Sequence, residues 1–153
     1  MKMIQRVYID TSVIGGYFDE EFEFYTKLFF EKVEQEKFKI ILSDILTTEL
    51  QGAPDKVVTF FNSISKKNIE YIEQTEDSIQ LGEEYLNEGV VGKTSRTDCR
   101  HIALATLINA DILVSWNFKH IVNIKRIRGF NSVNIKYGHR ILEIRTPREI
   151  LEL

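Results

Sequence analysis

The sequence predicts an α/β fold in which helices cover both faces of a central parallel sheet. Short apolar runs alternate along the chain with longer segments whose apolar residues recur at helical spacing. Strands separated by helices favour parallel pairing, because each helix carries the chain back to the edge where the next strand begins. With 153 residues and 43% hydrophobic content, the chain is expected to form one domain, residues 1–153, around a substantial core.

The first half of the chain has the pattern of three strands and four helices. The strand at 6–10 ends on Asp10 and leads to a glycine hinge at 15–16. A helix is expected at 19–35, because acids suit the positive end of the helix dipole and apolar residues follow at helical spacing. The other elements are a strand at 38–42, a helix capped by Ser43 or Asp44, a helix from Pro54 to 64, a short alternating strand at 69–72 and a helix at 78–88.

The second half is centred on a helix and the strand that it feeds. Ser95 and Thr97 are residue types that cap helices, and a broad apolar face runs from there to an expected stop at Asn109. A buried strand is expected at 111–115. The remaining elements are a basic, Asn-rich loop at 120–138, a last strand at 141–144 and a terminal helix opened by Pro147.

Four oxygen-bearing side chains are expected at one edge of the sheet. A reversal of winding sets the first strand beside the strand at 111–115, and ligands bind outside the carboxyl ends of strands at such a reversal. A helix packed antiparallel to the strand it feeds begins at this same edge. The four residues are Asp10 after the first strand, Glu49 in the helix after the second, Asp98 at the start of the central helix and Asn117 after the strand at 111–115.

Convergence of these residues would create a site for a divalent ion. Taken alone, each acid also fits an ordinary place at a helix start or on the surface. Three carboxylates at one edge, however, repel one another unless a cation neutralises them. Hard oxygen ligands suit Mg²⁺ or Mn²⁺, whereas the dispersed histidines and the single cysteine, Cys99, make no zinc pattern. We therefore expect Asp10, Glu49 and Asp98 to bind Mg²⁺ or Mn²⁺.

Four motifs stand in order along the chain, followed by a closing Pro147-Arg148-Glu149-Ile150-Leu151. The motifs are Tyr8-Ile9-Asp10-Thr11-Ser12, Ser43-Asp44-Ile45-Leu46-Thr47-Thr48-Glu49, Asp98-Cys99-Arg100-His101-Ile102-Ala103 and Leu113-Val114-Ser115-Trp116-Asn117-Phe118. In these residues, which span nearly the whole chain, the sequence resembles the PIN-domain family. The resemblance implies a PIN-like fold and a ribonuclease dependent on Mg²⁺ or Mn²⁺.

A free-standing chain of this length resembles the VapC-type toxins of toxin–antitoxin pairs. The resemblance implies endoribonuclease activity on RNA, a small antitoxin protein as partner, and a homodimer. It also implies that Thr11 or Ser12 supplies a hydroxyl near the substrate phosphate or a metal-bound water. The implied catalytic residues are Asp10, Glu49 and Asp98, as the acids of the metal site, with Asn117 as the fourth position.

The fourth position departs from the family, which often has aspartate where this chain has Asn117. Asparagine can ligate or orient a water but supplies no charge, so a second ion would bind weakly and turnover would be slow or even absent. Asp111 cannot replace it, because it begins its strand and so lies at the other edge. Asp44 is the reserve candidate. His101, one helical turn from Asp98, is expected either to orient that acid or to make a structural hydrogen bond.

Substrate contacts are expected from the residues around Asn117. Trp116 has two interpretations, packing in the core and stacking on an unpaired RNA base. Phe118 is expected to lie in the core. Lys119, His120 and Lys125 are the expected phosphate contacts.

Other functions remain alternatives. A non-catalytic PIN-fold module that binds RNA or protein is favoured by the uncharged Asn117. A phosphatase of the haloacid-dehalogenase type also has an aspartate after its first strand, but it needs a second one two positions later, where this chain has Ser12. Nucleotide-cofactor binding is disfavoured, because Gly15-Gly16 lacks the spaced-glycine pattern.

The charge distribution and the lack of targeting segments are compatible with a cytoplasmic protein that acts on RNA. The net charge is −3, but the segment 119–148 is rich in Lys and Arg and has a single acid, Glu143. Such a segment either attracts phosphate or is ordinary solvated surface. No signal-peptide core and no membrane-spanning apolar run is present, and a lone cysteine fits a reducing compartment, so we expect a cytoplasmic protein without membrane attachment.

Overall fold

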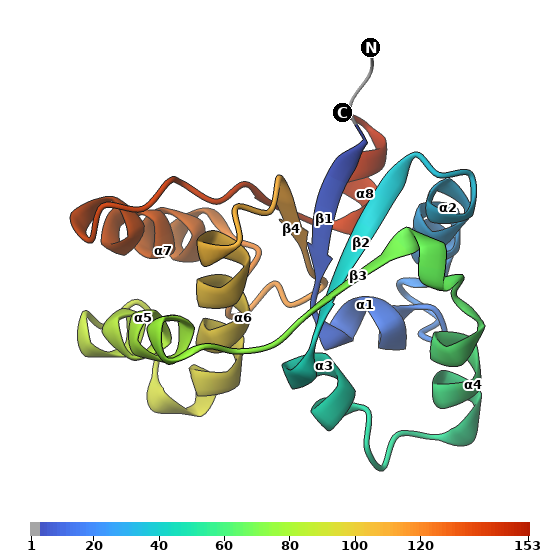
Figure 1. Ribbon diagram of the computed structural model, residues 1–153, viewed down its shortest axis with the longest axis horizontal. Helices are drawn as coiled ribbons and strands as arrows, with labels where there is room; N and C mark the ends of the chain where they lie inside the picture. Colours follow the sequence, from blue (N-terminus) through green and yellow to red (C-terminus); the bar gives the residue numbers. More distant parts are fainter. Residues whose placement is uncertain (1–3) are drawn as a thin grey trace.

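Five parallel strands form the central sheet in the order β3-β2-β1-β4-β5, in a computed structural model that describes residues 4–153 (Figure 1). All neighbouring strands pair in parallel, and β1 lies between β2 and β4. The predicted parallel α/β fold and the predicted pairing of the first strand with the fourth are thereby confirmed. The strands are β1 (Gln5–Ile9), β2 (Phe38–Ser43), β3 (Ile69–Ile72), β4 (Ile112–Val114) and β5 (Ile144–Arg145).

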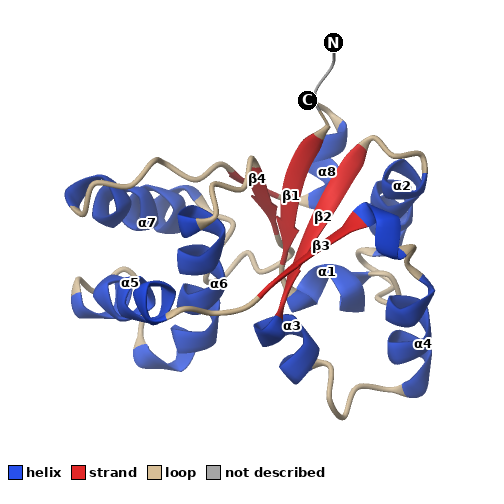
Figure 2. Ribbon diagram, in the orientation of Figure 1, coloured by secondary structure: helices blue, strands red, loops and turns tan. Residues whose placement is uncertain are grey.

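Helices cover both faces of this sheet, as predicted (Figure 2). One face is covered by α1 (Thr11–Gly16), α2 (Glu23–Glu34), α4 (Asp55–Ser63) and α8 (Pro147–Leu151). The other face is covered by α5 (Glu76–Asn87), α6 (Arg96–Leu107) and α7 (Ile124–Lys136). The short helix α3 (Asp44–Glu49) begins where β2 ends. Within residues 4–153, no helix combines the length and apolar character needed to cross a membrane.

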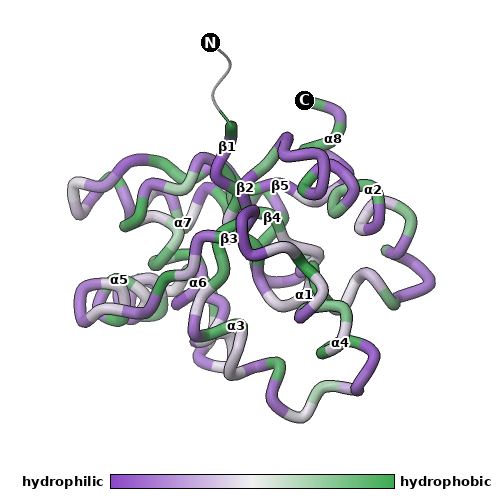
Figure 3. Tube along the Cα trace, turned by 45° about the vertical axis from the view of Figure 1, so that its right-hand side comes forward, coloured by the Kyte–Doolittle hydropathy of each residue, from purple (hydrophilic) through white to green (hydrophobic). Residues whose placement is uncertain are grey.

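The core has two layers because successive residues of a strand point to opposite faces. In β1, Val7 and Ile9 pack with α1 and α2, whereas Tyr8 points to the opposite layer and packs with α6. Figure 3 shows polar and apolar residues alternating along the surrounding helices, as expected where one side of each helix is buried. The alternation along β1 therefore determines which of its side chains point toward each group of helices.

Local signals at the helix ends fix the elements that carry the expected site. The Ser43 hydroxyl accepts a hydrogen bond from the Leu46 N–H at 3.4 Å, which starts α3 directly at the end of β2. Of the two predicted caps, Ser43 is therefore the cap, and Asp44 is the first helical residue. Glu49 is the last residue of this six-residue helix. Asn109 has a φ of 55°, which ends the α6 segment as predicted.

The predicted loop at 120–138 is wrong, because most of it forms α7. The Asn123 side chain caps this helix by accepting a hydrogen bond from the Arg126 N–H at 2.9 Å. The buried residues of α7 are Phe130, Val133 and Asn134, an apolar face too narrow to stand out among charged and Asn residues. The mostly polar sequence of α7 therefore made this helix hard to recognise. Its buried aromatic residue is Phe130.

Other predictions also differ from the structure, among them two element boundaries and the glycine hinge. The last strand is at Ile144–Arg145 rather than 141–144, because Ile141 is exposed. The second helix begins at Glu23 rather than 19. The expected glycine hinge is part of α1, and a Cβ on Gly16 would lie 2.8 Å from the Trp116 indole. Gly16 is thus a close-packing position rather than a hinge.

Candidate metal-binding and catalytic site

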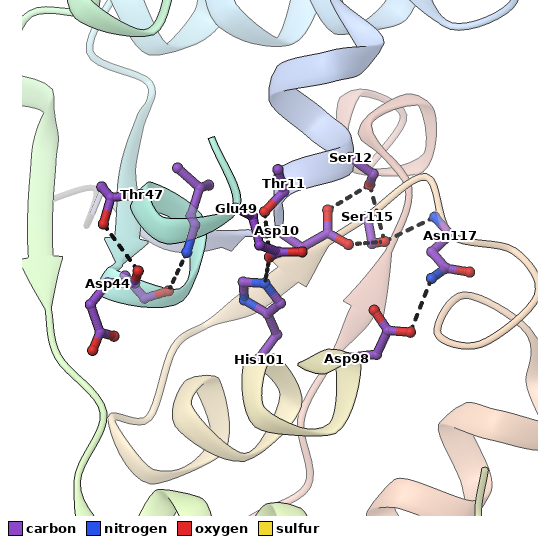
Figure 4. Close-up of polar contacts among 12 residues, drawn as sticks. Asp10, Thr11, Ser12, Asp44, Thr47, Glu49, Asp98, His101, Ser115 and Asn117 are labelled. Carbon is purple, nitrogen blue, oxygen red and sulfur yellow. Dashed lines mark hydrogen bonds and ion pairs between the residues drawn. The ribbon is translucent and has the colours of Figure 1, made fainter. Parts of the chain in front are cut away.

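The structure brings the four sequence-predicted residues to the carboxyl edge of β1 and β4 (Figure 4). Asp10 directly follows β1, and Asn117 follows β4. Glu49 ends α3, and Asp98 lies in the first turn of α6. Figure 4 shows the three carboxylates turned toward a common region between these elements. The topology therefore gathers side chains that are far apart in the sequence.

Asp10 is buried and held by hydroxyl groups on both of its oxygens. Its side chain is 4% exposed. Ser12 donates to Oδ1 and Ser115 donates to Oδ2, each at 2.6 Å. Burial raises the pKa of Asp10, and the charge of His101 and the two hydroxyl groups only partly offset this effect. The carboxylate is fixed in place but is costly to keep ionised.

Glu49 is more exposed and is held through a single oxygen. Its Oε1 accepts hydrogen bonds from the Thr11 hydroxyl at 2.6 Å and from His101 Nε2 at 2.8 Å. Burial acts to raise the pKa of Glu49, but the bonds from His101 and Thr11 outweigh it, so the pKa is lowered. Glu49 is therefore the acid of the three that most readily carries a negative charge.

Asp98 faces the amide of Asn117. The Asn117 Oδ1 accepts a hydrogen bond from the His120 backbone N–H at 2.9 Å, which fixes the amide orientation. Its Nδ2 then points to Asp98 Oδ2 at 3.4 Å. Burial, followed by the negative charge of Asp10, raises the pKa of Asp98. Asn117 thus offers a donor to Asp98, where an aspartate would have added a further negative charge.

The electrostatics of this edge suit a hard cation. Within residues 4–153, no Lys or Arg forms an ion pair with Asp10, Glu49 or Asp98. In the same part of the chain, no group of three His, Cys, Asp or Glu side chains is already spaced to hold a metal ion directly. The donors are all oxygens, and Mg²⁺ commonly uses one or two carboxylates with water completing its shell. The three carboxylates are therefore ligands of the chemical type that such an ion binds.

The hydroxyl residues and the aromatic residues of the sequence motifs have clear structural contacts. Thr11 and Ser12 contact Glu49 and Asp10, respectively. Trp116 is 8% exposed, stacks on Phe22 with ring centroids 4.5 Å apart and donates from Nε1 to the Thr26 hydroxyl at 2.9 Å. The packing interpretation accounts for this residue, and the stacked, buried indole leaves no open face for an RNA base.

The expectation for Phe118 was wrong. We expected it in the core, but its side chain is 51% exposed, and its ring centroid lies 6.2 Å from those of Phe22 and Trp116. The core volume near it is already filled by the stacked pair. The exposed aromatic ring beside Asn117 is therefore Phe118.

The expected phosphate contacts lie around the same loop. Lys119 and Lys125 are exposed, and His120 is partly buried. The Nδ1 of His120 is shielded and has no hydrogen-bond partner within the described residues. The reserve candidate, Asp44, accepts a hydrogen bond from the Gln74 N–H at 3.1 Å instead, and Asp111 accepts one from the Arg6 N–H at the opposite edge.

Two residues of this site and the hydrogen-bond partners of a third were not predicted from the sequence. Ser115, which holds Asp10, and Tyr8, which contacts His101, were not singled out. Of the two expectations for His101, orienting Asp98 or making a structural hydrogen bond, the structure shows hydrogen bonds, and their partners, Glu49 and Tyr8, were not predicted. The sequence did carry a signal for each of these three residues, because each has a polar group and lies in or beside an apolar stretch. Their hydrogen-bond partners, however, depend on packing between elements.

Comparison with known proteins supports the fold class. No protein-family model matches the sequence, and no curated protein matches it. The strand order and helical layers are those of a PIN-like α/β fold. The chain is similar to a chain in the crystal structure of VapBC2 from Rickettsia felis bound to a DNA fragment from their promoter. The TM-score is 0.55 at 17% identity, and the match covers 92% of this chain and 98% of the other.

Proposed function

We propose that this protein is an endoribonuclease that depends on Mg²⁺ or Mn²⁺ and acts as the toxin of a toxin–antitoxin pair. The observation that carries the proposal is the gathering of Asp10, Glu49 and Asp98, from three separate elements, at the carboxyl edge of β1 and β4. The similarity to a VapBC2 chain supports the fold in which this edge is built.

In this proposal Asp10, Glu49 and Asp98 would hold the ion. The chemistry that it would supply there is activation of a water and stabilisation of the charge developing on the phosphodiester. Ser12 and Ser115 keep Asp10 in place, and Asn117 donates to Asp98. Each contact restricts an acid that would otherwise turn away from its negatively charged neighbours.

Substrate is held by the loop that follows β4. Lys119 and His120 contact phosphate oxygens. Phe118 offers an exposed aromatic face on which an unpaired base stacks. It takes the place that one interpretation of the sequence gave to Trp116. The RNA segment bound here is therefore single-stranded.

The proposal includes a small antitoxin protein as partner, a homodimer and action in the cytoplasm. The VapBC2 structure supports the first of these, because it contains a chain of the same fold in a complex bound to promoter DNA. Co-expression of a candidate antitoxin tests the partner directly. It should relieve growth inhibition caused by this chain and should co-purify with it.

A non-catalytic PIN-fold module that binds RNA or protein is the second candidate. It is favoured by Asn117, which adds no negative charge, and by the absence within residues 4–153 of a group of side chains already spaced to coordinate a metal ion. This candidate requires no divalent ion for RNA binding.

An RNA cleavage assay separates the two candidates. Purified wild-type protein should cut single-stranded RNA with Mg²⁺ or Mn²⁺ and stop when EDTA is added. Asp10→Asn and Asp98→Asn should each lower the rate by at least about 100-fold, whereas Asp77→Asn, which changes an exposed acid of α5, should not. RNA binding without cleavage under every metal condition would favour the second candidate.

A further inference from the structure

His101 is a buried residue of α6 whose two ring nitrogens both have partners. Its side chain is 2% exposed. Nδ1 lies 2.6 Å from the Tyr8 hydroxyl, and Nε2 lies 2.8 Å from Oε1 of Glu49. The ring therefore bridges the central strand of the sheet and an acid at its carboxyl edge. Figure 4 shows the contact with Glu49.

The partners of His101 determine which nitrogen carries a proton. An ionised carboxylate only accepts hydrogen bonds, so Nε2 must donate to Glu49. The Tyr8 hydroxyl can donate to Nδ1 or accept from it, because Ser43 Oγ lies 3.0 Å away on its other side and can take the opposite role. Burial raises the pKa of Tyr8, so this hydroxyl keeps its proton. In every arrangement, the Nε2–H points to Glu49.

The bridge joins a buried ring to a more exposed side chain. The His101 ring packs edge-on against Tyr8, with centroids 5.6 Å apart at 72°. Glu49 ends a six-residue helix, and its side chain is 38% exposed. A glutamate in this situation has several rotamers available unless a neighbour selects one. His101 is the buried neighbour that makes this selection.

The selection leaves one oxygen of Glu49 available. Both hydrogen bonds to Glu49, from His101 and from Thr11, end on Oε1. Within the part of the chain that the structure describes, Oε2 accepts no hydrogen bond from a side chain. Oε1 is thus the anchored oxygen, and Oε2 is the oxygen available to an added ligand.

We propose that His101 is a positioning residue that anchors Glu49 Oε1 and thereby presents Oε2 to the divalent ion. The inference rests on the proposed function, because it assigns a task within the same acidic edge. It extends the site to the hydrogen-bonded series Ser43–Tyr8–His101–Glu49. Hydrogen bonds that orient metal ligands commonly change metal affinity by 10- to 100-fold.

Mn²⁺ affinity in the absence of RNA tests the inference. We expect His101→Leu to weaken Mn²⁺ binding, measured by electron paramagnetic resonance, by about tenfold or more. His101→Gln retains an N–H that reaches Glu49 and should stay within about threefold of wild type. His139→Leu, the same change at a histidine away from this edge, should have no effect.

A double-mutant cycle separates positioning from a general structural role. In a Glu49→Gln background, His101→Leu should cause no further loss of Mn²⁺ affinity, because the anchored group has already been changed. Equal losses in both backgrounds would overturn the inference. Nitrogen-15 spectra of the wild-type imidazole should show a proton on Nε2, and a neutral ring with its proton on Nδ1 alone would also overturn it.

The outcomes also separate this inference from the proposed function. If Glu49→Gln weakens Mn²⁺ binding and His101→Leu does not, the inference fails and the nuclease proposal stands. If Mn²⁺ affinity follows the expected pattern but RNA is never cut, the nuclease proposal fails and the positioning role stands. If wild-type protein binds no Mn²⁺, both fail. Should His101→Leu not fold, His101→Gln decides alone: a folded His101→Gln protein that loses as much affinity as Glu49→Gln overturns the inference.

Discussion

Ser115 donates a 2.6 Å hydrogen bond to Oδ2 of Asp10 and so joins the carboxyl ends of β4 and β1. The same hydroxyl accepts the backbone N–H of Asn117 at 2.9 Å. Ser12 makes the corresponding pair of contacts, to Oδ1 of Asp10 and from the N–H of Trp116. Through these hydrogen bonds, the buried Asp10 connects the loop after β4 to the end of β1.

Removing the Ser115 hydroxyl should destabilise this connection. Ser115→Ala leaves a buried carboxylate oxygen without its donor, which typically costs about 1–3 kcal/mol. We expect a loss of this size in the free energy of unfolding, measured with urea at pH 7. Ser132→Ala, at an exposed position of α7, is the matched control and should change stability by less than about 0.5 kcal/mol. Equal stability of the Ser115 variant and wild type would contradict the account.

Asp98 should reduce stability at neutral pH. Burial and the charge of Asp10 raise its pKa in the folded protein, so the folded state favours the protonated form. Its favourable contribution is present below the ordinary aspartate pKa of about 3.9 and is lost as the pH rises through the raised folded-state value. Asp98→Asn should therefore raise the melting temperature at pH 7.

Calorimetric melting of Asp98→Asn at two pH values checks this sign. The difference from wild type should shrink at about pH 3.5, where the wild-type carboxyl is mostly protonated in both states. A variant that melts below wild type at pH 7 would contradict this prediction.

Divalent ions should stabilise the folded protein. At a Mn²⁺ concentration of about 100 times Kd, binding adds about 2.7 kcal/mol, equivalent to roughly 5–10 °C for a chain of this size. Thermal unfolding with and without Mn²⁺ measures this shift, and EDTA should reverse it. In Asp10→Asn the shift should be lost. A shift that persists in this variant would place the bound ion elsewhere.

Phe118 should contribute to RNA binding without contributing to the core. Its ring is 51% exposed, so Phe118→Ala should leave the melting temperature close to wild type. Stacking on an aromatic ring contributes about 1–3 kcal/mol per base, so affinity for single-stranded RNA should fall between about 5- and 150-fold. Fluorescence anisotropy in an Asp10→Asn background measures binding without cleavage.

Two further variants test whether a loss of RNA binding is specific to Phe118. Ile135→Ala removes another exposed apolar side chain, on α7, and should not affect RNA binding. Trp116→Ala, by contrast, removes a buried indole and should cost about 3–5 kcal/mol of stability. If Phe118→Ala and Ile135→Ala bind RNA equally well, Phe118 does not contact a base.

The topology and the acidic edge followed from the sequence because both depend on periodicity. Strands alternating with helices fix parallel pairing, and parallel pairing places residues such as Asp10 and Asn117 at one edge without any knowledge of side-chain contacts. Helix α7 was missed because Phe130 and Val133 are its only buried apolar residues. The hydrophobic pattern of a helix weakens when so few of its residues reach the core.

The contacts within the site could not be predicted from spacing. His101 is one turn from Asp98, yet its ring points to Glu49, because Tyr8 in the adjacent strand holds its other nitrogen. Similarly, Trp116 and Phe118 are two residues apart in one loop, and only the presence of Phe22 determines which ring is covered. Such choices depend on a third residue from a distant element.

Isothermal titration with Mn²⁺ tests the central claim most directly. Wild-type protein is compared with a variant that combines Asp10→Asn and Asp98→Asn, after circular dichroism has shown that both are folded. The account predicts saturable Mn²⁺ binding to wild type and none to the double variant. Binding of equal affinity to both proteins, or no binding to wild type, would contradict it.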